Sequence, residues 1–332
     1  MTQPIPFVEI WRGDMLESQH LGHAVVCDAN GQIVESWGDA EKVIYPRSSC
    51  KMLQALPLIE SGAAAAHGLG AEHLALACAS HQGAAIHTDR VQLWLNDLGL
   101  SVSDFRCGPQ KPSDKDAHEA LVRAGKQPCQ IHNNCSGKHS GFLTLNKHLG
   151  AGSEYGEVDH PVQVAARASF EEMTGETAEF YGIDGCSAPN FSTSVAGLAR
   201  AMARMARPQG TGARAQAATQ LVEAMRMHPD LVAGEGRACT ELMRAMDGKV
   251  AVKTGAEAVF VAILPEQGLG MALKIVDGGT RAAEAAIAAL LVKYGALDAK
   301  HPMAVKRMHG PILNWNGINT GHMRISADFI HS

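Results

Sequence analysis

The chain has 332 residues, 46% of them hydrophobic and 19% charged, with a formal net charge of -5. These values are typical of a soluble globular protein with one large domain or two smaller ones. The absence of basic clusters argues against nucleic-acid binding, and no apolar run is long enough to span a membrane. Because the first residues lack the charge and apolar core of a signal peptide, we expect a cytoplasmic protein.

Eight cysteines are spread along the chain without tight spacing or a Cys-x-x-Cys motif. Such spacing in a long chain predicts reduced thiols rather than a disulfide framework. Cys27 and Cys78 each lie among apolar neighbours, so we interpret both as small core residues.

The first predicted element is a β-hairpin over residues 23–35, in which Asn30-Gly31 favours the positive φ angles of a tight turn. After Pro46 the apolar spacing becomes helical. Pro57 is expected to kink or end the first of these helices. The predicted helical segments are 53–59, 74–78, 91–98, 117–122, 162–173, 195–205 and 215–225.

Strands return near the C-terminus, with predicted strands at 250–253, 258–264 and 270–276 and an alanine-rich helix at 281–294. Strands at both ends with helices between them predict an α/β fold of the α+β type. Residues of about 5–45 and 250–332 would form one mainly antiparallel sheet, and residues of about 46–249 a helical layer or lobe. We expect a single domain over residues 1–332, with a cleft at the seam between sheet and helices.

Two short motifs contain the parts of an amide-cleaving site. Ser48-Ser49-Cys50-Lys51 places a serine one helical turn from a lysine, and Lys253-Thr254-Gly255 places a second lysine on a predicted strand. A serine hydroxyl needs a base at neutral pH, and a lysine on the same helix face can serve. In this order along the chain, the two motifs are typical of serine hydrolases that use lysine as the base.

Two segments of the helical middle combine glycine, cysteine and polar residues. Residues 131–141 indicate a polar loop that opens a helix at Phe142, where backbone N–H groups could face an anion or a developing oxyanion. A solvated connection is the alternative. Residues 181–189 place Asp184 and Cys186 beside glycine and proline, in either a functional loop or a plain turn.

Together these segments resemble the successive signatures of one family, the Rhizobium-type (class 3) L-asparaginases of the asparaginase II family. The similarity extends from Val8-Glu9 to the predicted helix start at Gly278-Gly279-Thr280-Arg281. It implies a fold like that of serine β-lactamases and glutaminases, and hydrolysis of L-asparagine to L-aspartate and ammonia. The motifs are Arg47-Ser48-Ser49-Cys50-Lys51, Ala79-Ser80-His81-Gln82-Gly83, His132-Asn133-Asn134-Cys135-Ser136-Gly137-Lys138-His139, Asp184-Gly185-Cys186 and Lys253-Thr254-Gly255-Ala256-Glu257.

The resemblance implies two serine–lysine pairs, Ser48 with Lys51 and Ser80 with Lys253. Ser48 would attack the amide and Lys51 would take its proton, so that an aspartyl ester forms and is then hydrolysed. Lys253 and Ser80 would complete a proton relay. A homodimer is also implied.

The resemblance further implies a substrate pocket and a bound zinc or zinc-like ion that organises this pocket rather than activating water. From the chemistry of asparagine recognition, we expect Arg47 and His139 to hold the substrate carboxylate and Asp184 its ammonium group, with a surface or structural arginine as the alternative for Arg47. The other implied substrate-binding residues are Cys239, Thr254 and Gly255. The implied ion ligands are Cys135, Lys138 and Cys186, although residue chemistry alone would favour His132 or His139 over a lysine amine.

Two other activities stay open at this point. A glutaminase differs in substrate by one methylene, which a pocket rejects by only ~1–3 kcal/mol. A penicillin-interacting serine hydrolase shares Ser-x-x-Lys and Lys-Thr-Gly, but such enzymes normally act outside the cytoplasm, and no clear Ser-x-Asn motif lies between the two here.

Overall fold

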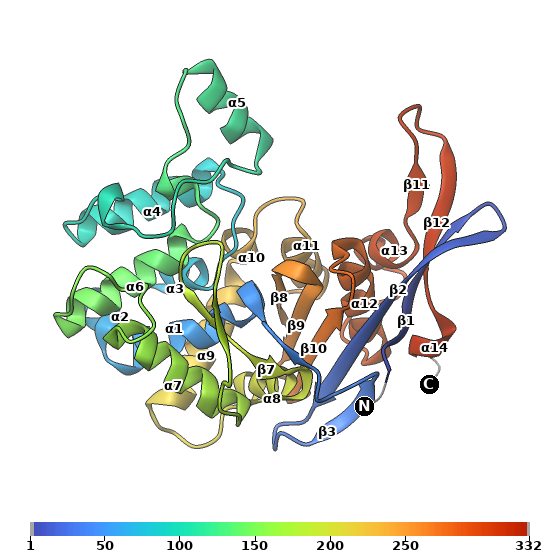
Figure 1. Ribbon diagram of the computed structural model, residues 1–332, viewed down its shortest axis with the longest axis horizontal. Coiled ribbons are helices and arrows are strands. Elements are labelled where there is room, and N and C mark those ends of the chain that lie inside the picture. Colours follow the sequence, from blue (N-terminus) through green and yellow to red (C-terminus); the bar gives the residue numbers. More distant parts are fainter. Residues whose placement is uncertain (1–2, 331–332) are drawn as a thin grey trace. The chain divides into compact units, whose positions relative to one another are not determined.

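The computed structural model describes residues 3–330 and divides into two compact units, each assembled from several segments of the chain. Unit 1 comprises residues 3–49, Thr193–Arg207 and 241–330, and unit 2 comprises Cys50–Ser192 and Pro208–Thr240. Figure 1 shows the helices and strands of both units. We expected a single domain over residues 1–332. The division into two compact units does not test this expectation, which stays a prediction. Within residues 3–330, no helix is long and apolar enough to cross a membrane.

Unit 1 is built on an eight-stranded antiparallel sheet. Its strands are β1 (Ile5–Arg12), β2 (Met15–Cys27), β3 (Ile33–Trp37), β8 (Ala251–Gly255), β9 (Val259–Leu264), β10 (Leu269–Ile275), β11 (Pro311–Leu313) and β12 (Asn319–Ile325). The order is β11-β12-β1-β2-β10-β9-β8, with β3 paired to β2 off this path. N-terminal strands thus pair with C-terminal ones, as in the registers Val8↔Ile325 and Val25↔Ala272, which confirms the prediction of one sheet from both chain ends.

The predicted hairpin is formed by β2 and β3, but its turn differs from the expected one. Gly31 alone of the Asn30-Gly31 pair has a positive φ, of 80°. The Asp28 carboxylate accepts the backbone N–H groups of Asn30 and Gln32, both at 2.9 Å. An aspartate side chain therefore stabilises the turn, and Asn30 has no need of the left-handed conformation.

Helices α8 (Val195–Ala206) and α12 (Thr280–Lys293) both pack on β9, whose six residues are all buried. α8 also lies so close to β10 that a Cβ at Gly270 would stand 2.0 Å from the nitrogen of Ala203, so glycine is required there. The predicted helix at 195–205 is confirmed, but it belongs to the sheet unit, because a periodic pattern locates a helix without saying what it packs against. The remaining elements of unit 1 are α13 (Pro302–His309), α14 (Ala327–Ile330) and the paired short strands β4 (Val43–Ile44) and β7 (Thr193–Ser194).

Unit 2 is mainly helical, as predicted for the middle of the chain. Its helices are α1 (Lys51–Glu60), α2 (Ala63–Ala66), α3 (Ala71–Ala77), α4 (Ala85–Asp97), α5 (Lys115–Arg123), α6 (Ser136–Leu149), α7 (Pro161–Thr174), α9 (Ala213–Met227) and α10 (Pro229–Val232), and it holds one hairpin, β5 (Tyr181–Ile183) with β6 (Pro189–Phe191). Pro57 does not end the first helix, which continues to Glu60. Helix α11 (Ala238–Ala245) begins where the chain leaves this unit.

The start of α6 corrects a prediction. Residues 136–141 were expected in a polar loop, but they form the first half of a helix whose residues Ser136–Leu145 are buried. A Cβ at Gly137 would lie 2.4 Å from the carbonyl oxygen of Leu76, at the end of α3. Glycine at this position therefore serves close packing between two helices rather than loop flexibility.

Candidate active site

In unit 1, the Lys-Thr-Gly motif ends strand β8. Lys253 is fully buried, and its Nζ donates a hydrogen bond of 2.8 Å to the carbonyl oxygen of Thr254. Alternate residues share one face of a strand, so Lys253 and Gly255 point the same way. A Cβ at Gly255 would lie 2.6 Å from the carbonyl oxygen of Pro46 and 3.1 Å from the nitrogen of Ser49. The face of β8 that carries Lys253 is thus turned toward the segment that contains Ser48.

That segment is a short 3₁₀ helix over Arg47–Cys50 that leads directly into α1. Arg47 has a φ of 54°, in the left-handed region that costs a non-glycine residue roughly 1–3 kcal/mol and that recurs at functional sites. Ser49 is buried, and its hydroxyl donates to the carbonyl oxygen of Pro46 at 2.7 Å. Because this hydroxyl is used within the turn, the half-buried Ser48 is the better nucleophile candidate of the two serines.

In unit 2, the side chain of Lys51 is buried at the start of α1 and lies at the centre of a polar cluster. Its Nζ stands 3.1 Å from the Ser80 hydroxyl and 3.1 Å from Cys135 Sγ, and donates a further hydrogen bond to the carbonyl oxygen of Ala79. The structure therefore places Ser80 in contact with Lys51, which was predicted to pair with Ser48. The two predicted serine–lysine pairings themselves stay predictions.

The three predicted ion ligands also lie in unit 2. Cys135 immediately precedes α6, Lys138 lies in its first turn, and Lys138 Nζ is 3.2 Å from Cys186 Sγ. The hydrogen bond between the two sulfurs raises the pKa of Cys135 well above its ordinary value and lowers the pKa of Cys186 well below it. Of the two thiols, Cys186 therefore loses its proton more readily, and Cys135 Sγ also donates a hydrogen bond of 3.0 Å to Asn134 Oδ1.

The charge of Lys138 follows from the same group. Burial alone would lower the pKa of its amine, but the thiolate of Cys186, together with Cys135 and Asp184, raises it instead. In the metal-free protein Lys138 is therefore an ammonium group paired with a thiolate. It must lose its proton before it can ligate an ion.

Asp184 and Cys186 are brought to this cluster by the turn of the β5–β6 hairpin. The turn is closed by hydrogen bonds from Asp184 N to Ala188 O, of 2.9 Å, and from Ser187 N to Asp184 O, of 2.8 Å. Ser187 adopts a left-handed φ of 67° in it. The sequence left two possibilities for residues 181–189, a functional loop or a plain turn. The structure shows a turn, and the side chain of Cys186 in this turn contacts the buried Lys138.

His139 is buried one residue after Lys138, and its Nδ1 lies 2.9 Å from the hydroxyl of Tyr155. Burial lowers the pKa of its imidazole. Its Nε2 has no hydrogen-bond partner at ordinary distance and angle within the described part of the chain. Cys186 beside the ring favours the charged imidazole, whereas Lys138 and Lys51 oppose it. Tyr155, held in turn by the backbone N–H of Arg106 at 2.8 Å, has no sequence signal that connects it to the site.

The other predicted substrate-binding residues are placed as follows. Arg47 and Thr254 are half-buried in unit 1, in the two segments that meet at Gly255. Cys239 is buried on α11. No disulfide bond joins any two of the eight cysteines, all of which lie within residues 3–330.

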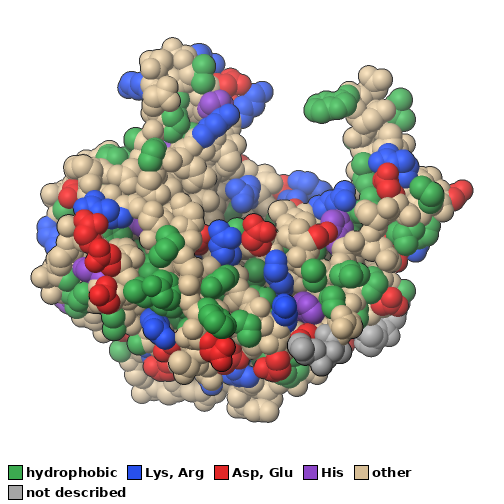
Figure 2. Space-filling model, viewed as in Figure 1, with side chains coloured by type: hydrophobic (Ala, Val, Ile, Leu, Met, Phe, Trp, Pro, Cys, Tyr) green, Lys and Arg blue, Asp and Glu red, His purple; other side chains and the backbone are tan. Residues whose placement is uncertain are grey.

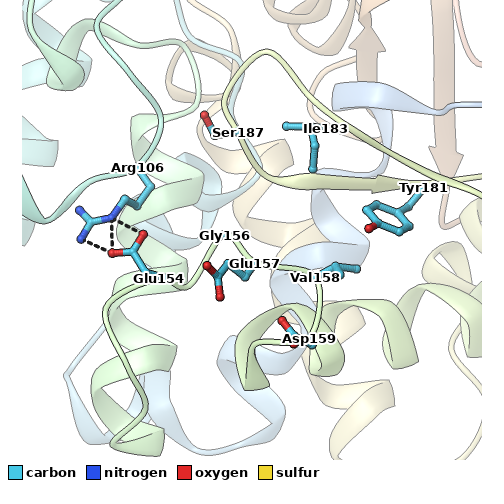
Figure 3. Close-up of a pocket in the computed structure, with 9 residues that line it drawn as sticks. All are labelled: Arg106, Glu154, Gly156, Glu157, Val158, Asp159, Tyr181, Ile183 and Ser187. Atoms are coloured by element: carbon cyan, nitrogen blue, oxygen red, sulfur yellow. Dashed lines mark hydrogen bonds and ion pairs between the residues drawn. The ribbon is translucent and has the colours of Figure 1, made fainter.

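A separate cavity of about 530 Å³ opens in unit 2 beside the β5–β6 hairpin (Figure 3). The ion pair between Arg106 and Glu154, of 2.8 Å, forms one wall of this cavity. None of the predicted catalytic, substrate-binding or ion-binding residues is among those that line it, although Ile183 and Ser187 flank the turn that carries Asp184 and Cys186. Its volume is therefore not evidence for the chemistry of the buried cluster.

Two further observations bear on binding. Among residues 3–330, no three His, Cys, Asp or Glu side chains gather in a way that could hold a metal ion, so an ion at Cys135 and Cys186 would depend on the Lys138 amine.

On the face shown in Figure 2, cationic and anionic side chains are interspersed. That face offers no broad basic patch for nucleic acid.

Unit 2 thus holds a buried lysine beside a serine hydroxyl, and unit 1 holds a second lysine on a strand that faces a segment with serine. Residues 8–325 match the family of L-asparaginase II, and the chain belongs to this family. This confirms the resemblance inferred from the motifs and makes the protein a hydrolase that acts on amides.

Solved structures with a similar arrangement include a β-lactamase from Mycobacterium bovis, with 15% identity over 82% of this chain and 94% of that chain and a TM-score of 0.45. They also include Mglu in its glutamate form, with 13% identity over 83% of this chain and 61% of that chain and a TM-score of 0.47. The chain therefore spans about three fifths of the length of Mglu. No match was found among curated proteins.

Proposed function

We propose that this protein is an L-asparaginase that hydrolyses L-asparagine to L-aspartate and ammonia through a serine nucleophile activated by lysine. Family membership over residues 8–325 supports the amide substrate. The observation that carries the mechanism is the buried amine of Lys51, 3.1 Å from the hydroxyl of Ser80 and three residues after Ser48. Such an amine can accept a serine proton when it is neutral.

In the proposed reaction, Ser48 Oγ attacks the side-chain amide carbon of asparagine and its proton passes to Lys51. Lys51 passes this proton to the amide nitrogen, the tetrahedral intermediate releases that nitrogen as ammonia, and an aspartyl ester on Ser48 remains. Water hydrolyses this ester and releases aspartate. Ser80, in contact with Lys51, is the group through which Lys51 exchanges protons, and Lys253 belongs to the same proposed relay.

Arg47, His139 and Asp184 are proposed to bind the two charged groups of the substrate. The half-buried Asp184 can pair with the α-ammonium group, and Arg47 can pair with the α-carboxylate. Cys239, Thr254 and Gly255 complete the proposed pocket. A homodimer stays part of the proposal.

The residues present fit a zinc ion. Cys135 and Cys186 offer two sulfur donors and Lys138 an amine nitrogen at 3.2 Å from Cys186, and all three are buried. Zinc binds sulfur and nitrogen donors in tetrahedral geometry, so these three side chains would leave the fourth position to water. When bound, the ion would supply a fixed positive charge that orders the α6 start and the β5–β6 turn. No catalytic step is assigned to it.

The test is a comparison of three substrates with one enzyme preparation: ammonia release from L-asparagine and from L-glutamine, and ring opening of benzylpenicillin. We expect asparagine to be the best substrate, with glutamine slower by about 10- to 200-fold in kcat/KM, since one methylene contributes ~1–3 kcal/mol. Faster ammonia release from glutamine would make the protein a glutaminase. Ring opening without ammonia release would make it a penicillin-interacting hydrolase.

A further inference from the structure

His81 follows Ser80 directly, is 1% exposed, and has no role in the proposed chemistry. Its Nδ1 accepts the backbone N–H of Gly83 at 3.1 Å, and its Nε2 lies 2.9 Å from the hydroxyl of Ser136. Because an imidazole nitrogen that accepts a hydrogen bond carries no proton, the proton of the neutral ring is on Nε2. His81 therefore donates to Ser136.

The hydroxyl of Ser136 is oriented by a second bond. It donates to the carbonyl oxygen of Ile131 at 2.9 Å, so its oxygen lone pairs are left to accept from His81. The backbone N–H of His81 also donates to the carbonyl oxygen of Asn134, at 3.1 Å. The segment after α3 is thus joined to the start of α6 by a side-chain bond and a backbone bond.

The neighbours of these two residues are the contacts of Lys51. Ser80 precedes His81, Cys135 precedes Ser136, and each lies 3.1 Å from Lys51 Nζ. A shift of one segment along the other would lengthen one of these two distances. Displacements of about 1 Å at a catalytic group can cost as much as 10²-fold in rate.

The ring of His81 is itself held in place. It stacks on the ring of His87, with centroids 4.8 Å apart and an interplanar angle of 10°. His87 is buried and its Nε2 lies 2.9 Å from the carbonyl oxygen of Asp230. A fixed ring plane keeps the His81 Nε2–H directed at Ser136, which a freely rotating side chain would not do.

We propose that His81 is a positioning residue, whose hydrogen bond to Ser136 holds Ser80 and Cys135 together around Lys51. This inference rests on the proposed function, because it assigns His81 to the geometry of the same Ser80–Lys51 contact. A residue that serves folding alone would contribute stability through either of its two ring hydrogen bonds. A positioning residue acts through the bond to Ser136 in particular.

Two replacements separate these bonds. In His81→Asn the amide can reach the Nδ1 position and keep the Gly83 bond, whereas in His81→Gln it can reach the Nε2 position and keep the Ser136 bond. Each variant loses one hydrogen bond and is expected to lose about 1 kcal/mol of unfolding free energy. We expect kcat for asparagine to fall ~10- to 100-fold in His81→Asn with little change in KM, and to stay within about threefold of the wild type in His81→Gln.

Ser136→Ala removes the acceptor and should reproduce the His81→Asn loss of kcat. The double variant His81→Asn/Ser136→Ala should be no worse than the poorer single variant, since both remove the same bond. Equal kcat values for His81→Asn and His81→Gln, or losses that multiply in the double variant, would overturn the inference.

A readout independent of turnover keeps the two proposals apart. Amide hydrogen exchange in peptides that cover residues 79–83 and 131–138 should be faster in His81→Asn than in His81→Gln. A wild-type protein without asparaginase activity would refute the proposed function, and the exchange comparison would still decide on His81. Unchanged exchange at 131–138 in His81→Asn would reject the link to α6.

Discussion

Lys51 Nζ lies 3.1 Å from Cys135 Sγ, so the lysine proposed as base is in direct contact with one of the proposed ion ligands. Cys186, by contrast, is bonded to Lys138, at 3.2 Å. The two cysteines therefore differ in their relation to the catalytic lysine, although both would ligate the same ion. This difference can be measured.

The first prediction compares Cys135→Ala with Cys186→Ala. Each should remove zinc from the purified protein, because each deletes one of two sulfur ligands. Cys186→Ala should raise KM for asparagine more than it lowers kcat, whereas Cys135→Ala should also lower kcat about 10-fold, since Lys51 loses a fixed contact. Zinc per chain is measured by atomic emission beside steady-state kinetics.

Cys27→Ala is the matched control, since Cys27 is buried in unit 1 and donates to the carbonyl oxygen of Ala196. This variant should keep both zinc and activity. Stoichiometric zinc in a Cys135→Ala/Cys186→Ala protein would refute the ligand set. Equal kcat values in the two single variants would reject the influence of Cys135 on Lys51.

The second prediction concerns the nucleophile. Ser48→Ala should abolish asparagine hydrolysis, by at least ~10³-fold in kcat, without loss of the fold, because a methyl group cannot form the ester. Ser49→Ala is the control: its hydroxyl bonds Pro46, so the variant should lose about 1 kcal/mol of unfolding free energy and keep most of its activity. Trapping of a covalent aspartyl ester by mass spectrometry identifies the serine directly.

Ser80→Ala is the informative counterpart, because Ser80 contacts Lys51. If Ser80 only relays protons, its loss should cost about 10²- to 10⁴-fold, as for general acid–base groups. An ester found on Ser80, together with mild loss in Ser48→Ala, would exchange the roles of the two serines.

Much of the fold could be predicted from local patterns. The apolar runs that predicted strands at 258–264 and 270–276 and the spacing that predicted a helix at 162–173 are confirmed within about two residues. The start of α6 was missed because Gly137 resembles a loop residue in the sequence, while its role is set by Leu76, 61 positions away. Contacts of that kind leave no local signal.

The site shows the same division between local and distant information. The motifs indicated Ser48, Lys51 and Lys253 as candidates, because the chemistry needs these residue types at these spacings, and their roles stay predictions. They did not indicate that Lys51 contacts Ser80 and Cys135, since these side chains meet only when α1, the segment after α3 and the start of α6 pack together.

The third prediction tests the close approach at Gly255. In Gly255→Ala the new Cβ would stand 2.6 Å from the carbonyl oxygen of Pro46, so either β8 or the Ser48 segment must move. We expect a loss of ~1–3 kcal/mol of unfolding free energy and a fall in kcat, because overpacking shifts backbone that carries the serine. Gly152→Ala is the control, since open space surrounds that position, and it should match the wild type in both measurements.

The last prediction concerns acid stability. Burial lowers the pKa of several imidazoles, His23, His73 and His139 among them, and the stacked pair His81 and His87 contributes in the same direction. Burial is the main cause that lowers the pKa of both His81, by a large amount, and His87. Well above pH 6.5 both rings are neutral in the folded and the unfolded chain, so they add no pH dependence there. As the pH falls below 6.5, the unfolded chain binds protons that the folded protein cannot yet accept. The free energy of unfolding should therefore decrease with falling pH, by at most about 1.4 kcal/mol per pH unit for each histidine, until the folded rings themselves become protonated.

Urea unfolding at pH 7, 6 and 5 measures this slope, in a range above the usual titration of carboxylates. In His87→Gln, whose amide can still donate to the carbonyl oxygen of Asp230, the slope should be reduced by about the contribution of one proton. The same unfolding free energy at pH 5 and pH 7 in the wild type would show that these imidazoles accept protons as readily in the folded protein as in water, which their burial argues against.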